Sequence, residues 1–127
     1  TSTFSIYSFN ANGLVHSVKM HHISSAISHR KPHVFVLNES KTNSQTAKNL
    51  PNGDYQIHEE PGVKTTNHHL YKWGVVLGVR KDIQVVQRLT NLHAALRGRI
   101  VVVDVALPQS GNTAHIHRVF GVYAPWD

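Results

Sequence analysis

A carboxylate that directly follows a buried strand is the first candidate for chemistry in this sequence. The apolar run Val34–Leu37 ends at Asn38 and Glu39. Such a run is typical of a strand that is buried on both faces. Because an unpaired carboxylate is too costly to bury inside the strand, Glu39 is expected at the rim of a sheet, where it could hold a hard cation. The alternative is that Glu39 only caps the following turn.

Asn10 is the second candidate, because the preceding residues predict a strand that ends beside Glu39. Residues 4–10 alternate apolar and small polar side chains, which favours a strand. Residues 14–29 carry apolar side chains at three- and four-residue spacing, which predicts an amphipathic helix that ends before Pro32. Strand, helix and strand then form a βαβ unit with parallel strands. Since ligands of such sheets bind at the carboxyl ends of the strands, Asn10 and Glu39 should share one rim.

The rest of the chain predicts mainly antiparallel strands. We expect strands over residues 55–58, 73–80, 83–89, 99–107 and 115–123, a short helix over 42–50, a loop over 59–67 and a turn over 108–113. The whole chain, residues 1–127, is therefore predicted to be one mixed α/β domain, in which an antiparallel meander is added to the βαβ unit.

Composition narrows the classes of partner. Lysine and arginine number 13 against 7 acids, for a net charge of +6, and 11 histidines would add positive charge on mild acidification. This excess favours a polyanionic partner, nucleic acid above all. The absence of cysteine excludes a disulfide framework and a thiolate metal site, and it predicts an intracellular location, the nucleus included. No apolar run approaches the length of a membrane span, so we expect no membrane association.

Four short motifs follow one another along the chain. They are Ser8–Gly13, Leu37–Lys41, Gly74–Leu77 and Val119–Pro125. Together they resemble the endonuclease/exonuclease/phosphatase family, and most closely the apurinic-type endonuclease domains of non-LTR retrotransposons. The resemblance extends over nearly the whole chain. It implies a nuclease that hydrolyses phosphodiester bonds of DNA or RNA with Mg²⁺ or Mn²⁺.

The resemblance implies roles for the residues that match these motifs. Glu39 matches the family's metal-binding glutamate, and Asn10 matches the asparagine beside it in the metal site. Tyr123 matches the tyrosine that hydrogen-bonds the phosphate, so Glu39, Asn10 and Tyr123 are the expected catalytic residues. Asn12 stands where many members have an aspartate, and Trp126 stands where many have an asparagine. We keep Asn12 as a candidate contact to substrate.

Three basic residues are further candidates for contacts to substrate phosphates. Lys41 is expected near the substrate edge of the sheet. Arg97 and Arg99 flank Gly98 and could grip a phosphate. The equally plausible alternative for the arginines is a turn with exposed charges.

Two later motifs of the family do not occur in this sequence. These are a Gly-Asp-x-Asn segment, whose aspartate activates the attacking water, and a Ser-Asp-His segment, whose histidine stabilises the transition state. We therefore expect only the first half of the family's four-layer α/β sandwich. A single sheet would leave residues such as Val36, Leu77 and Val103 bare, which predicts a homodimer that packs sheet on sheet. The alternative function is a basic nucleic-acid-binding module without catalysis.

Several other side chains have a structural interpretation that competes with a functional one. His115 and His117 project to the same face of a predicted strand, but without a known third ligand we do not favour a histidine metal site. His22 is expected to lie in the core, on the apolar stripe of the helix. Trp73 is expected to serve in packing rather than in base stacking. Asp104 is expected to pair with a neighbouring basic side chain.

Overall fold

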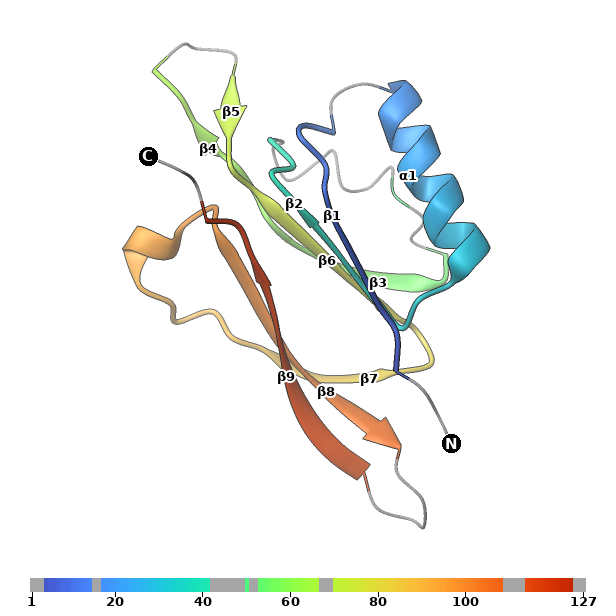
Figure 1. Cartoon of the computed structure of the whole chain (residues 1–127). Coiled ribbons are helices and arrows are strands. Elements are labelled where there is room, and N and C mark those ends of the chain that lie inside the picture. The colour runs from blue at the N-terminus through green and yellow to red at the C-terminus, as the bar shows by residue number, and fades with distance from the viewer. Residues whose placement is uncertain are drawn as a thin grey trace.

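Two facing sheets and one helix make up most of the fold. The computed structural model describes residues 4–14, 17–41, 50, 53–66, 70–108 and 114–124. In chain order its elements are β1 (Ile6–Asn10), α1 (Ser17–Arg30), β2 (Val34–Asn38), β3 (Tyr55–Glu60), β4 (Val63–Lys64), β5 (Tyr71–Lys72), β6 (Val75–Arg80), β7 (Gln84–Arg88), the 3-10 helix η2 (Ala94–Leu96), β8 (Ile100–Pro108) and β9 (Ala114–Val122) (Figure 1). The predicted mixed α/β class is confirmed.

The first sheet has the strand order β1-β2-β6-β3. β1 and β2 run parallel and α1 connects them, as the βαβ prediction requires, whereas β6 is antiparallel to both β2 and β3. The helix buries Met20, Ile23 and Ile27 against this sheet, because residues three, four and seven positions apart share one face. It ends at Arg30, because the next residue, Lys31, has a φ of +45° and Pro32 cannot continue a helix.

The second sheet has the order β7-β8-β9 and covers the face of the first sheet that α1 leaves free. Val36 and Leu77 of the first sheet pack in one cluster with Val101 and Val103 of the second, and all four are at most 6% exposed. The sheets approach so closely that a Cβ on Gly121 would lie 3.0 Å from Val75 Cγ1.

The prediction of a bare inner face was therefore wrong. The chain turns after β6, and Ile83 N donates to Arg80 O at 2.9 Å in this turn. The strands that follow pair with one another rather than with the first sheet. A single chain thus supplies both sheets of the sandwich, and its inner apolar residues cover one another.

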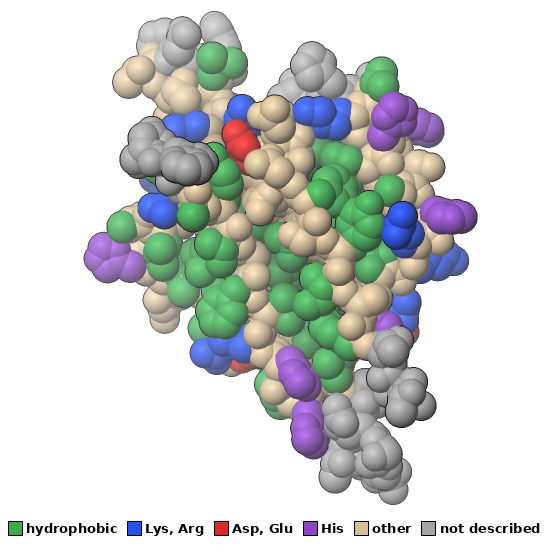
Figure 2. Space-filling view, viewed as in Figure 1, with side chains coloured by type: hydrophobic (Ala, Val, Ile, Leu, Met, Phe, Trp, Pro, Cys, Tyr) green, Lys and Arg blue, Asp and Glu red, His purple; other side chains and the backbone are tan. Residues whose placement is uncertain are grey.

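Apolar side chains remain exposed elsewhere. Ile116, Phe120 and Val122 on β9 are 58%, 55% and 48% exposed, and Ile6 on β1 is 54% exposed. The three residues of β9 point away from the sheet interface, because they alternate with Val119 and Gly121, which face it. Figure 2 shows hydrophobic side chains gathered over β9 and β1.

Other expectations fall partly outside the described residues. The helix predicted over 42–50 lies there except for its last residue, and so does most of the turn predicted over 108–113. The loop predicted over 59–67 was partly wrong, because β3 extends to Glu60 and β4 forms a short ribbon with β5. No helix among the described residues is long and apolar enough to cross a membrane.

Candidate functional site

The carboxyl ends of β1 and β2 form the rim on which the predicted site residues lie. Asn10 is in register with Asn38, and the segments beyond both strands stay hydrogen-bonded to one another. Ala11 N donates to Asn38 O at 2.9 Å, and Gly13 N donates to Glu39 O at 2.8 Å. Asn10 and Glu39 therefore lie on the same rim, in two adjacent segments of backbone.

Four residues form a continuous series of contacts along this rim, through their side chains and the backbone N–H of Asn12. Asn10 Oδ1 accepts from Asn12 N at 2.8 Å, and Asn12 Oδ1 accepts from Lys41 Nζ at 3.1 Å. Lys41 Nζ in turn lies 3.3 Å from Glu39 Oε1. The side chains of Lys41 and Glu39 are 39% and 19% exposed. The pair consequently lies at the surface and is accessible to ions and to substrate.

The local backbone directs these side chains away from the positions that an extended strand would give them. Asn12, Glu39 and Lys41 have φ values of 45°, 59° and 54°, a left-handed conformation that costs energy for residues other than glycine. Neighbouring segments hold this conformation in place, since Lys41 N donates to Trp73 O at 2.7 Å. At Gly74, a Cβ would collide with the Ser40 side chain, so glycine is required beside the site.

Tyr123 reaches the same rim from the second sheet. It follows β9, and its N–H donates to Arg99 O at 2.8 Å. The preceding residue, Val122, accepts from Asn38 Nδ2 through its carbonyl at 3.4 Å, which ties the end of β9 to the end of β2. Sequence reasoning did not single out Asn38. The available signal was an amide at the end of an apolar run, one residue before the candidate carboxylate.

Asn38 also carries a buried oxygen. Among the described residues, no hydrogen-bond donor reaches its Oδ1. A buried amide oxygen without a hydrogen-bond donor is uncommon in folded proteins, so a water molecule or an ion is the expected partner of Asn38 Oδ1. The oxygen lies on the residue next to Glu39, which makes it relevant to any cation or water held at this rim.

The two candidate arginines lie where the second sheet meets the rim. Gly98, between Arg97 and Arg99, accepts from Gly74 N through its carbonyl at 2.7 Å. The Arg99 guanidinium lies 5.8 Å from the centre of the Trp73 ring, and Arg99 Nε donates to Tyr123 O at 3.5 Å. Arg99 is therefore directed towards the Tyr123 segment, whereas Arg97 is exposed.

Trp73 lies between two cations at this edge. Lys72 Nζ is 4.2 Å from the ring centre, and the Arg99 guanidinium is 5.8 Å from it. The ring is half-buried. It thus packs at the rim, as the sequence predicted, and it holds two positive charges beside the candidate site.

Comparison with known proteins bears on the fold of the chain. No protein-family model matches the sequence, and no curated protein is similar to it in sequence. Solved structures do match. The catalytic domain of Xenopus laevis APE2 superposes with a TM-score of 0.71 at 12% identity, over 97% of this chain and 46% of that chain. The human Nocturnin catalytic domain, solved with a bound sulfate, gives 0.66 at 15% identity, over 92% and 48%. AP endonuclease LMAP from Leishmania major gives 0.64 at 16% identity, over 94% and 40%.

The chain shares the fold of these solved structures. It spans about half the length of the structures that it matches. At these identities the agreement is one of fold, and the family that the four sequence motifs indicated stays a prediction.

The donor atoms at the rim fit a hard cation. The Glu39 carboxylate and the side-chain oxygens of Asn10, Asn12 and Asn38 are the ligand types that Mg²⁺ and Mn²⁺ take. Mg²⁺ usually keeps several waters and binds through one or two carboxylates together with substrate phosphates. One glutamate beside several amide oxygens matches this mode of coordination. Asn38 Oδ1, which lacks a hydrogen-bond partner among the described residues, is a further oxygen that a bound water or cation could contact.

A histidine metal site finds no support in the described part of the chain. No group of three or more His, Cys, Asp or Glu side chains gathers there. The rings of His115 and His117 do share a face, with centres 6.5 Å apart, but both residues are exposed. The prediction that His22 is a core residue was wrong. Its side chain is exposed, because the buried stripe of α1 passes through Met20, Ile23 and Ile27 instead.

Most acids at other positions are already bound within the fold. Asp104 accepts from Arg118 Nε at 2.8 Å and from Gln87 Nε2 at 2.7 Å, and these hydrogen bonds lower the pKa of its carboxyl group to about 2. The predicted pairing of Asp104 with a basic neighbour is thus confirmed. Asp82 forms two hydrogen bonds with Arg80, which lower the pKa of its carboxyl group.

Proposed function

We propose that this chain is a metal-dependent phosphodiesterase module that hydrolyses DNA or RNA. The observation that carries the proposal is the series of contacts from Asn10 through Asn12 and Lys41 to Glu39, on the rim that Tyr123 also reaches. Hard oxygen donors and a lysine on one edge of an α/β sheet, which the Tyr123 segment also reaches, suit the binding of a phosphate together with a divalent ion.

Each residue has a separate role in this proposal. Glu39 and Asn10 hold Mg²⁺ or Mn²⁺, and the bound ion supplies neutralisation of negative charge on the phosphate oxygens. Tyr123 donates a hydrogen bond to a phosphate oxygen. Lys41 contacts the phosphate once the ion neutralises Glu39. Asn12 orients Lys41 through the hydrogen bond at 3.1 Å.

The arginines extend the phosphate-binding surface along the strand of nucleic acid. Arg99 lies beside Tyr123 and Trp73, and Arg97 is exposed on the other side of Gly98. Guanidinium groups bind phosphates through paired hydrogen bonds. The net charge of +6 favours the approach of any nucleic acid.

Activation of the attacking water is the catalytic step that this chain alone supports least. Asp82 and Asp104 are held by arginines, and Glu60 accepts from Gly98 N at 2.7 Å. The proposed activity is therefore low unless a partner polypeptide contributes the base.

The same observation supports a second candidate function, a nucleic-acid-binding module without catalysis. The basic surface and the phosphate-binding residues would serve such a module equally well. Its binding would weaken steeply with salt, because lysines and arginines displace counterions from the phosphates.

One assay separates the two candidates. Plasmid DNA and single-stranded RNA are incubated with the chain in Mg²⁺, in Mn²⁺ and in EDTA, and the wild type is compared with Glu39→Gln. An exposed acid at the opposite end of the first sheet, Asp54, provides the matched control Asp54→Asn. Cleavage that needs metal, disappears in Glu39→Gln and persists in Asp54→Asn supports the enzyme. Salt-sensitive binding without cleavage supports the binding module.

Homodimerisation, expected from the sequence, stays a proposal, but its surface changes. The inner face of the sheets is covered within one chain, so it cannot be the interface. The exposed residues Ile116, Phe120 and Val122 support an interface through the outward face of β9. β9 is also an edge strand, whose unpaired backbone groups favour pairing with another chain.

A further inference from the structure

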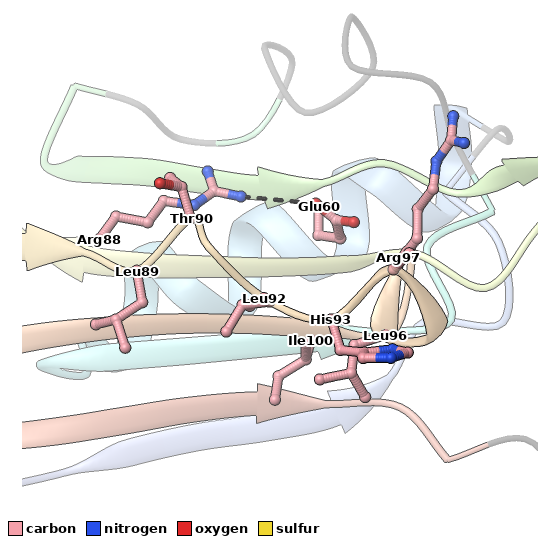
Figure 3. A pocket seen from close by; sticks show the side chains of 10 residues that line it. Glu60, Arg88, Leu89, Thr90, Leu92, His93, Leu96, Arg97 and Ile100 are labelled. Atoms are coloured by element: carbon pink, nitrogen blue, oxygen red, sulfur yellow. Dashed lines mark ion pairs between the residues drawn. The ribbon is translucent and has the colours of Figure 1, made fainter.

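A cavity of about 310 Å³ opens beside the rim, between the end of β3, the segment after β7 and the start of β8. Its volume lies at the lower end of the range for sites that bind small molecules. Figure 3 shows the side chains of Leu89, Leu92, Leu96 and Ile100 along one side, with Glu60 and Arg88 opposite them. Apart from Arg97, none of the residues that line this cavity was a functional candidate in the sequence.

The apolar side of the cavity suits a flat aromatic ring. Leu89, Leu92, Leu96 and Ile100 are all half-buried, so their side chains are available for contact. Unpaired bases that proteins bind in pockets are typically held between apolar or aromatic side chains and read by hydrogen bonds along the Watson–Crick edge. The cavity offers the first of these features.

Glu60 offers the second feature, a group that can form hydrogen bonds with the edge of a base. Its Oε2 accepts from Gly98 N at 2.7 Å, which fixes the carboxylate in place. Its Oε1 forms an ion pair with Arg88 (Figure 3), and the 3.9 Å between Oε1 and Nη2 is too long for a hydrogen bond. That guanidinium nitrogen donates instead to Glu59 O at 2.9 Å. Glu60 Oε1 can therefore accept from an N–H donor that enters the cavity.

The cavity is joined to the proposed metal site by the backbone. Gly98, next to the cavity-lining Arg97, binds Gly74, and Gly74 O accepts from Ser40 N at 3.1 Å. These successive hydrogen bonds place the cavity wall two strand spacings from the Glu39 segment, roughly 10 Å. That distance is within reach of a neighbouring nucleotide on the same strand. Arg97 points away from the leucines in Figure 3, where it can meet a phosphate outside the cavity.

We propose that this cavity binds an unpaired guanine of the nucleic-acid strand whose phosphate lies at Glu39. Guanine presents two adjacent donors, N1–H and the 2-amino group. Glu60 Oε1 can accept one of them, and Oε2, which keeps a second lone pair beside its bond to Gly98 N, can accept the other. Uracil and thymine present a single ring N–H between two carbonyls, and these would face the carboxylate unfavourably. The proposal deepens the proposed function, because the cavity would select which strand position meets the metal.

The test is a nucleotide titration of the full chain, followed by ¹H–¹⁵N NMR in EDTA so that the metal site has no part in it. GMP, UMP and ribose 5-phosphate are compared. GMP is expected to bind about tenfold more tightly than UMP and to shift the amide signals of Thr90, Leu92 and Gly98. Equal binding of ribose 5-phosphate and GMP would show that only the phosphate is recognised, and would overturn the proposal.

Two variants with matched controls test the cavity itself. Glu60→Gln keeps an oxygen for Gly98 N but loses the negative charge, so the affinity for GMP should fall to that for UMP. Asp54→Asn should leave the preference unchanged. Thr90→Trp fills the cavity and should abolish the GMP-dependent shifts, whereas Thr66→Trp, at another exposed threonine, should not. Folding of every variant is verified by circular dichroism. Unchanged GMP binding in a folded Thr90→Trp contradicts the proposal.

A final comparison separates a free nucleotide from a nucleotide within a strand. A short single-stranded oligonucleotide with one guanine should bind more tightly than GMP and more tightly than its uracil counterpart. Binding of GMP without preference for the guanine oligonucleotide would overturn the assignment to a strand. Guanine binding in a chain that cleaves no substrate would disprove the nuclease while leaving the cavity assignment intact, so the two failures are distinguishable.

Discussion

Lys41 Nζ lies 3.3 Å from Glu39 Oε1 and 3.1 Å from Asn12 Oδ1, so a lysine holds the carboxylate proposed to bind the metal. A divalent ion and an ammonium group would compete for the same negative charge. Since both side chains are partly exposed, the pair can open. In the proposed function, binding of the ion to Glu39 would free Lys41 for a phosphate, and the rim would change from an internal ion pair to a site for metal and substrate.

This competition predicts that Lys41→Met binds Mn²⁺ more tightly than the wild type. An exposed ion pair contributes about 1 kcal/mol or less, so the gain should be up to roughly fivefold. Nucleic-acid binding should weaken in the same variant. Electron paramagnetic resonance of free Mn²⁺ measures the first effect, and a filter-binding assay measures the second. Lys64→Met, at an exposed lysine of β4, is the control, and weaker Mn²⁺ binding in Lys41→Met would contradict the competition.

Asp104→Asn should destabilise the chain at neutral pH, and the difference from the wild type should shrink in acid. The pKa of this carboxyl group is about 2 in the folded chain against an ordinary value of 3.8, because Arg118 and Gln87 hydrogen-bond to the ionised form. A lowered carboxyl pKa gives stability that is present above the ordinary value and is lost as the pH falls from about 4 to about 2. Urea denaturation at pH 7 and pH 3 measures this, and a constant difference between the two proteins would refute it.

His58 should make the chain less stable in mild acid. Burial lowers the pKa of this imidazole below its model-compound value of 6.5, and the nearby Arg88 adds to the effect. The unfolded chain therefore takes up the proton first, so stability falls as the pH drops below 6.5. His58→Gln should flatten the dependence of the melting temperature between pH 7 and pH 5. His29→Gln, at an exposed position of α1, should leave it unchanged.

Phe120→Ser should lower the tendency of the chain to associate. Phe120 is 55% exposed on the outward face of β9, next in the same row to Val122. If two copies pack through this face, removal of the ring shifts light-scattering masses at micromolar concentration from dimer to monomer. Val18→Ser is the control, because Val18 is 66% exposed on α1. A wild-type chain that is monomeric at all accessible concentrations would rule out the interface.

The sequence by itself determined the βαβ unit and the order of its elements. The alternation before Asn10, the three- and four-residue spacing of apolar side chains over residues 14–29, and the apolar run before Glu39 each depend on residues close together in the chain. Such patterns fix a βαβ unit, and a βαβ unit with short connections can place the ends of its parallel strands only on one edge. The shared rim of Asn10 and Glu39 could therefore be predicted.

Only the tertiary structure decided how the later strands pack and which side chains meet at the rim. Periodicity shows that β8 is apolar, but not that Val101 and Val103 face Val36 and Leu77 of the first sheet. The bond from Asn38 to Val122 joins residues 84 positions apart, and the cavity beside Glu60 needs three separate segments. Contacts of this kind depend on the relative placement of whole elements, which no local pattern encodes.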